Sequence, residues 1–207
     1  MFWRDPSPSI LFPYRGYKIP ISLAFDNVLT MFEVFEHEKF TDEQKFDTAF
    51  EIFADEEVWE QFPLSVRIDF VIQLLKNKLD IDLTKPSEDE KEPPPFDFIE
   101  DAARIHSSFL FDYNMDLREQ QGKLTWDSFL GLLYNLSDDC QFGKALHYRQ
   151  CPIPKQDKYN ADEVKRIKQQ KERYALKDER IIEKMRRIKE RQTLAKMEAH
   201  KRKVKGG

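Results

Sequence analysis

The stretch from Phe96 to Pro154 constrains the fold most, because its apolar and aromatic residues recur at the spacing of amphipathic helices. Two such segments are joined by a short turn, and a third, shorter helix is expected to end at Pro152 and Pro154. The stretch holds no set of residues typical of catalysis, and it offers aromatic surface that can pack. These features predict a protein that holds other proteins rather than one that converts a substrate.

Composition favours helices over sheets. Glycine is scarce, at 6 of 207 residues, and runs of β-branched residues are few. Hydrophobic residues make up 40% of the chain and include 17 phenylalanines, which is enough for a real core. We therefore expect an all-α protein, in which two small helical units are joined by a Pro-rich acidic linker and followed by a long basic C-terminal helix.

A charged, proline-rich segment marks the expected boundary between the helical units. Thr84–Pro95 reads TKPSEDEKEPPP and has no apolar residue besides proline, so it cannot bury enough surface to order itself. The expected order is an irregular lead, an N-terminal helical unit, the linker, a motif-bearing helical unit and the long basic helix, over residues 1–20, 21–80, 81–95, 96–154 and 155–207.

The N-terminal unit is expected to contain three helices. The first runs from Ile21 to about Glu36, and a capping box formed by Thr41 and Gln44 opens the second. The third covers Leu64–Lys78, where apolar residues again have helical spacing. In the lead before them, four prolines argue against a helix.

Charge is distributed unevenly along the chain. Residues 1–159 hold 17 Lys and Arg against 30 Asp and Glu, whereas residues 160–207 hold 17 against 8. Three interpretations of the basic segment stay open: a solvated tail, a helix that docks on an acidic protein surface or on another copy, and a nucleic-acid binder. Its interspersed acids and its single aromatic residue, Tyr174, count against nucleic acid. The candidate electrostatic contacts are Lys165, Arg166, Lys184, Arg186 and Arg187.

The basic segment also has a heptad pattern. After a cap at Asn160 it is expected to form one helix to about Lys203. Apolar residues fall at intervals of seven, at Ile167, Tyr174, Ile181, Ile188 and Ala195. The companion positions are mostly polar, so the pattern predicts a narrow apolar stripe and a weak coiled coil.

Short motifs between Phe96 and Leu176 occur in the order of a known family. They lie at Asp97, Glu100, Asp101, Ser108–Leu110, Tyr113, Asp116-Leu117, Gly122–Leu124, Trp126, Phe129-Leu130, Leu136–Asp139, Phe142, Tyr148-Arg149 and Ile153-Pro154. In this order the chain resembles the bacteriophage "gene product fifteen" family, with a weaker likeness over Phe12–Lys78. Members of that family often have a second aromatic residue where this chain has Asp127.

The resemblance implies a role in phage tail assembly. Members belong to the tail modules of long-tailed phages and prophages of Gram-positive bacteria, next to the gene of the tape-measure protein. The implied function is that of a chaperone, which binds the tape-measure protein in the host bacterial cytoplasm and keeps it soluble. The implied partners are the tape-measure protein and tail-tube subunits, and the residues of the C-terminal helix leave self-association open as well.

The aromatic residues have two interpretations, a hydrophobic core and an exposed groove for a partner helix. Tyrosine and tryptophan favour a rim position, because they join an apolar ring to a polar group. The candidate groove residues are Phe109, Tyr113, Trp126, Phe129, Leu130, Phe142 and Tyr148.

Nothing in the sequence indicates an enzyme, a cofactor or a metal site. No phosphate-binding loop, dinucleotide motif or zinc-protease motif occurs. The histidines are isolated from other metal-binding residues, at His37, His106, His147 and His200.

The remaining features concern location and alternatives. No run of 18 apolar residues and no secretion signal is present, so no membrane contact is expected. Cys140 and Cys151 can pair or remain thiols, and a reducing cytosol favours thiols. Two alternatives to the chaperone stay open: a structural part of the virion in the tail or connector, and a nucleic-acid-binding protein that uses the basic helix.

Overall fold

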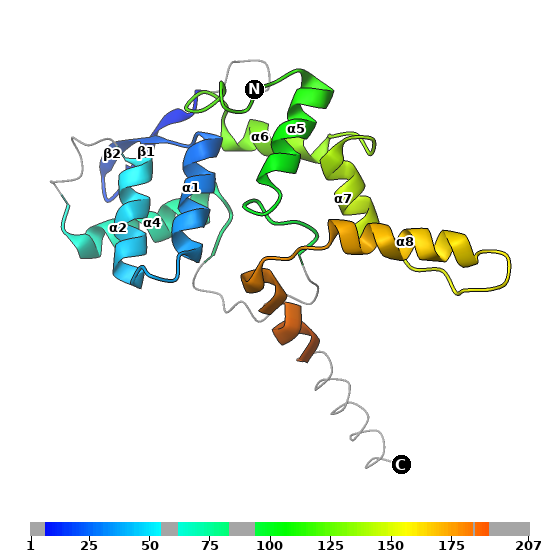
Figure 1. The fold of residues 1–207 in the computed structure, drawn as a ribbon. Helices are drawn as coiled ribbons and strands as arrows, with labels where there is room; N and C mark the ends of the chain where they lie inside the picture. Colours follow the sequence, from blue (N-terminus) through cyan, green and yellow to red (C-terminus); the bar gives the residue numbers. More distant parts are fainter. Residues whose placement is uncertain (1–6, 55–61, 83–93, 184, 191–207) are drawn as a thin grey trace, which may run out of the picture. The chain divides into compact units, whose positions relative to one another are not determined.

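The structure is a computed structural model that describes residues 7–54, 62–82, 94–183 and 185–190. The described residues form two compact units (Figure 1). The first unit draws on residues 1–85 and 109–136, and the second on residues 86–108 and 137–207. The chain therefore passes from one unit to the other more than once.

The first unit begins with a β-hairpin, which corrects the expectation of an irregular lead and of an all-α fold. Strand β1 (Ser9–Tyr14) pairs antiparallel with strand β2 (Tyr17–Ser22). The connecting residues Arg15 and Gly16 have φ values of 46° and 86°. Positive φ at both central residues is the geometry of a two-residue hairpin turn, and glycine adopts it without strain.

The hairpin contains two of the prolines that argued against a helix in this segment. Pro13 lies opposite Lys18, and Pro20 lies opposite Leu11. In the described residues the sheet has two strands, and its outer edges are unpaired apart from a bridge between Ile21 and Ala54, so a missing N–H on these edges costs little. One face of the hairpin is buried through alternating side chains, at Phe12, Tyr14, Ile19 and Ile21.

Three helices of the first unit were expected, and all three are present, although the first begins at Phe25 rather than at Ile21 because Ile21 and Ser22 belong to β2. They are α1 (Phe25–Glu36), α2 (Asp42–Phe53) and α4 (Leu64–Lys78). The capping box of α2 is confirmed, since Thr41 Oγ1 accepts from the Gln44 N–H and the Gln44 side chain accepts from the Thr41 N–H. The hairpin, α2 and α4 meet at Phe70, whose ring lies 5.1–5.3 Å from those of Phe12, Tyr14 and Phe50.

Helix α6 (Trp126–Tyr134) completes the first unit, although the sequence assigned it to the motif-bearing unit. Its Phe129 ring stacks on Phe25 at 5.0 Å, and Trp126 meets Phe32 edge-on at 5.9 Å. The backbone also pairs here, because Phe25 N–H donates to the Leu124 carbonyl and Trp126 N–H donates to the Leu23 carbonyl, both at 3.0 Å. The sequence predicted a single boundary between the units at residues 81–95, and the observed division of the chain differs from it.

The second unit contains α7 (Gln141–Gln150) and α8 (Ala161–Tyr174), and helix α5 (Ala102–Tyr113) contributes its first half to this unit. Ser108 on α5 binds the first turn of α7, since its hydroxyl accepts from the buried N–H of Phe142 at 3.0 Å. Gly143 allows close packing in the first turn of α7, because a Cβ at that position would collide with the Ser137 carbonyl.

The expected single basic helix is interrupted in the structure. Helix α8 ends at Tyr174, residues 175–178 are not helical, and the chain is helical again over 179–183 and 185–190. The part of the expected helix after residue 190 lies outside the described residues. Within the described residues, no helix is long and apolar enough to cross a membrane.

Candidate partner-binding site

The first unit contains an open pocket of about 960 Å³. One wall is helix α6, and the others come from the start of β1, the residue after β2, the end of α4 and the last residue of α5. The apolar lining consists of Pro8, Ile10, Leu23, Leu79, Tyr113, Trp126 and Leu132. Polar side chains accompany it, at Ser7, Lys78, Thr125, Asp127, Ser128 and Asn135. Apolar walls with a few polar groups are typical of a binding site.

The wall on α6 is fixed by its N-cap. Thr125 Oγ1 accepts from the Ser128 N–H at 3.2 Å and donates to the Ser128 hydroxyl at 2.9 Å. This cap orients the first turn, so that Trp126 is 7% exposed while Asp127 beside it is exposed. The pocket therefore has the indole in its lining and a carboxylate from the same turn.

Tyr113 links the end of α5 to the end of α6. Its hydroxyl donates to the Leu132 carbonyl at 2.9 Å, and its ring meets Phe109 edge-on at 5.6 Å. The ring is half-buried and lines the pocket. Because the hydroxyl is held by the α6 backbone, the tyrosine presents a fixed aromatic surface to any ligand of the pocket.

Gly131 leaves the α6 wall open. It lies in the middle of the helix, has no positive φ, and a Cβ there would meet nothing within 4 Å. Glycine inside a helix costs about 1 kcal/mol relative to alanine. No packing requirement within the described residues accounts for this glycine, and its effect is to deepen the pocket.

The seven candidate groove residues do not form one surface. Tyr113 and Trp126 line the pocket, whereas Phe109 and Phe129 are fully buried and stack on each other at 5.4 Å. Leu130 is half-buried on α6 outside the pocket lining. The other two belong to the second unit, where Phe142 is buried against Phe96 and Tyr148 stacks on Tyr174.

The candidate electrostatic residues also have different surroundings. Lys165 and Arg166 are exposed on α8, and no ion pair joins either to another described residue. Arg186 and Arg187 are exposed and pair with the carboxylate of Glu183. Lys184 lies outside the described residues.

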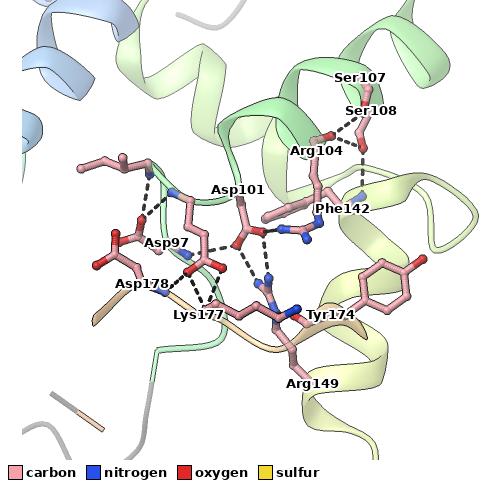
Figure 2. A network of polar contacts seen from close by, with 12 residues as sticks. Asp97, Asp101, Arg104, Ser107, Ser108, Phe142, Arg149, Tyr174, Lys177 and Asp178 are labelled. Carbon is pink, nitrogen blue, oxygen red and sulfur yellow. Dashed lines mark hydrogen bonds and ion pairs between the residues drawn. The ribbon is translucent and has the colours of Figure 1, made fainter. Parts of the chain in front are cut away.

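A buried ion pair, Asp101 with Arg149, holds the second unit together (Figure 2). Both Asp101 oxygens accept from Arg149, at 2.6 and 2.8 Å, and Arg104 adds a third contact at 2.7 Å. The Asp101 side chain is 0% exposed and that of Arg149 is 8% exposed. Burial by itself raises the pKa of Asp101, but the hydrogen bonds and charge of Arg149, with smaller contributions from Asp97 and Arg104, hold that pKa below its usual value.

The same guanidinium reaches two backbone carbonyls. Arg149 donates to the carbonyl of Tyr174 at 2.6 Å and to that of Pro95 at 3.2 Å. Glu100, one residue before Asp101, accepts from the N–H groups of Lys177 and Asp178. The acidic start and the Tyr-Arg pair of the sequence motifs therefore meet in one network, a role that sequence spacing alone did not indicate.

The polar groups of this network are paired with one another. Among the described residues, every buried side-chain nitrogen or oxygen has a hydrogen-bond partner, and no group of three metal-binding side chains occurs. Cys140 and Cys151 are free thiols, and Cys140 Sγ accepts from the Gly143 N–H at 3.2 Å as the cap of α7. The pocket of the first unit is thus the better candidate for binding a partner.

Comparison with known proteins identifies the family. No curated protein and no solved structure matches the chain. The sequence model of one family, described as bacteriophage Gp15 protein, matches residues 7–176, which include the hairpin, the pocket and the Asp101–Arg149 pair. The chain belongs to the bacteriophage Gp15 protein family.

Proposed function

We propose that this phage protein acts in tail assembly, where it binds the tape-measure protein and keeps it soluble until tail-tube subunits assemble around it. Family membership supports a structural or assembly role in a phage. The tape-measure protein is the partner implied by the tail-module setting of the family that the sequence resembles. Binding would take place in the cytoplasm of the host bacterium.

The observation that carries the proposal is the open pocket beside α6. Its aromatic walls, Tyr113 and Trp126, resemble the anchors by which proteins hold the apolar face of an amphipathic helix. A volume of about 960 Å³ accommodates several apolar side chains of one helix face. Asp127 and Lys78 offer opposite charges to polar residues that flank such a face.

Weak binding at one pocket is compatible with coating a long chain. Many copies bound side by side on one tape-measure chain would gain avidity, because neighbouring sites on the same chain raise the effective concentration. The exposed cations Lys165 and Arg166 would then be available to acidic tail-tube subunits. Both statements belong to the proposal and depend on the tape-measure interaction.

The test is co-expression with the tape-measure protein encoded in the same genome, followed by pull-down from the soluble lysate. Gly131→Leu fills the pocket from its open wall, and Gly131→Ala is the matched control, since a Cβ at this position meets no other atom within 4 Å. We expect wild type and Gly131→Ala to recover a soluble complex, and Gly131→Leu to recover at least about tenfold less because the added side chain clashes with the bound helix.

Two results would count against this function. A tape-measure protein that stays insoluble beside the wild-type chain, with no complex recovered, would remove the chaperone role. Peptides of this protein in purified phage particles, found by mass spectrometry together with that result, would favour a structural component of the tail or connector.

A further inference from the structure

The basic C-terminal segment is helical on both sides of a break at residues 175–178. Ala175 has extended angles, with φ −55° and ψ 143°, immediately after the end of α8. The four residues of the break are Ala-Leu-Lys-Asp, which include neither glycine nor proline. Asp178 caps the helix that follows, since its carboxylate accepts from the Arg180 N–H at 2.9 Å. Alanine, leucine and lysine are among the best helix formers, so local sequence sets where the second helix begins but does not explain why α8 ends at Tyr174.

Contacts from elsewhere in the second unit replace one hydrogen bond of the helix. In a continuous helix the Asp178 N–H would donate to the Tyr174 carbonyl. Instead, the Asp178 N–H donates to Glu100 at 3.0 Å, and the Tyr174 carbonyl accepts from Arg149 at 2.6 Å. Glu100 also accepts from the Lys177 N–H at 2.8 Å (Figure 2 labels Tyr174, Lys177, Asp178 and Arg149).

The same segment carries the apolar stripe at intervals of seven. Tyr174, Ile181 and Ile188 are buried, at 7%, 5% and 1% exposure, and the Tyr174 ring stacks on Tyr148 at 5.6 Å. Ile167 is half-buried. Residues seven apart share one face only along an unbroken helix. In the interrupted form the residues of the stripe before and after the break are therefore buried separately and do not form one continuous face.

We propose that residues 161–190 exchange between this docked, interrupted form and a continuous helix whose apolar stripe pairs with the stripe of a second copy. A continuous helix of this range would be about 45 Å long. Undocking would expose a row of isoleucine and tyrosine, and a heptad spacing fits another helix of the same period. A second copy supplies that helix with the same stripe.

The association is weak, because the companion seam is mostly polar. Lys171 and Asp178 lie at companion positions where a strong coiled coil would have apolar residues. The docked form is stabilised by charge-assisted hydrogen bonds from Glu100 and Arg149, and opening must break them. Self-association therefore depends on protein concentration, and it is independent of the proposed binding of the tape-measure protein.

The first test removes the carboxylate that holds the break. Glu100→Ala takes the acceptor from two backbone N–H groups, whereas Glu51→Ala, an exposed change on α2, is the matched control. Analytical ultracentrifugation should give Glu100→Ala a dimer dissociation constant at least about tenfold lower than that of wild type, as follows from losing hydrogen bonds to a charged group. Its far-ultraviolet circular dichroism should show more helix, and Glu51→Ala should behave like wild type.

A second variant keeps the docked contacts and penalises the continuous helix. Ala175→Gly combined with Lys177→Gly preserves the N–H that reaches Glu100, and it should weaken dimerisation of both wild type and Glu100→Ala by about tenfold. A folded Glu100→Ala protein with unchanged mass and unchanged helical signal would overturn the proposal. If near-ultraviolet circular dichroism shows that Glu100→Ala is unfolded, the test uses the two glycine substitutions in the otherwise wild-type chain. The proposal is then overturned if the wild-type protein does not dimerise, or if the two glycines leave its dimer dissociation constant unchanged.

Discussion

The carboxylate of Asp101 has no contact with solvent and is held by two nitrogens of Arg149. Asp101→Asn would leave the guanidinium buried without a countercharge, and breaking such a pair costs about 3–5 kcal/mol. We expect the variant to lose about that much free energy of unfolding, as measured by urea denaturation at neutral pH. Asp139→Asn, an exposed change in the same unit, should leave stability unchanged. Similar stability of the two variants would contradict the role given to the pair.

Acid should weaken the same contact. Burial raises the pKa of Asp101, yet Arg149 and the other donors bring the folded-state pKa below the usual value. The stabilisation is therefore complete above the unfolded-state pKa of about 4, and it is lost as the pH falls through the lower, folded-state pKa. We expect the stability difference between wild type and Asp101→Asn to shrink as the pH falls through this range, in urea denaturation at a series of pH values. A difference that stays constant would argue against the ion pair as its source.

At the scale of helices, two glycines should respond in opposite ways to alanine. In α7, a Cβ at Gly143 would collide with the Ser137 carbonyl and approach the Asp138 Cα to 2.9 Å, so the backbone must shift. Such overpacking costs about 1–3 kcal/mol. In α6, a Cβ at Gly131 meets nothing within 4 Å, so Gly131→Ala should add up to about 1 kcal/mol. Thermal unfolding of the two variants checks the order, and a less stable Gly131→Ala than Gly143→Ala would contradict it.

Elements whose signals are local could be predicted from sequence. The Thr41–Gln44 capping box and the helix over Leu64–Lys78 depend on residues within a few positions of each other, and both are present. The hairpin was missed because the prolines, which argue against a helix, were taken to mark an irregular lead, although two-stranded sheets accept proline at their edges. The break after α8 was missed because the side chains that take up its backbone groups, those of Glu100 and Arg149, lie far away in sequence.

At the scale of the whole molecule, sequence periodicity identifies the apolar face of a helix but not the surface that covers it. Tyr113 and Trp126 were predicted as partner contacts, and both line the pocket. Phe109 and Phe129 belong to the same helical pattern of aromatic residues in the sequence, but they are buried in the core of the first unit. Other pocket residues lie on α6 itself, and the rest come from the start of the hairpin, from Leu23 after β2 and from the end of α4, distant segments that carried no signal connecting them with α6.

The division of the chain leads to a prediction about fragments. Residues 1–85 alone lack α6, which covers Phe25 and Phe32 through Phe129 and Trp126. We expect this fragment to bind a hydrophobic dye and to unfold without a cooperative transition, because the apolar face of α1 is left exposed. Joining residues 1–85 to 109–136 by a flexible Gly-Ser linker of about 15 residues should restore cooperative thermal unfolding and abolish dye binding. The same fusion with Phe129→Asp is the control and should behave like the short fragment, since a buried charge cannot replace the stacked ring. A short fragment that unfolds cooperatively at the same temperature as the fusion would instead place a domain boundary before α5, where the composition of residues 81–95 predicts it.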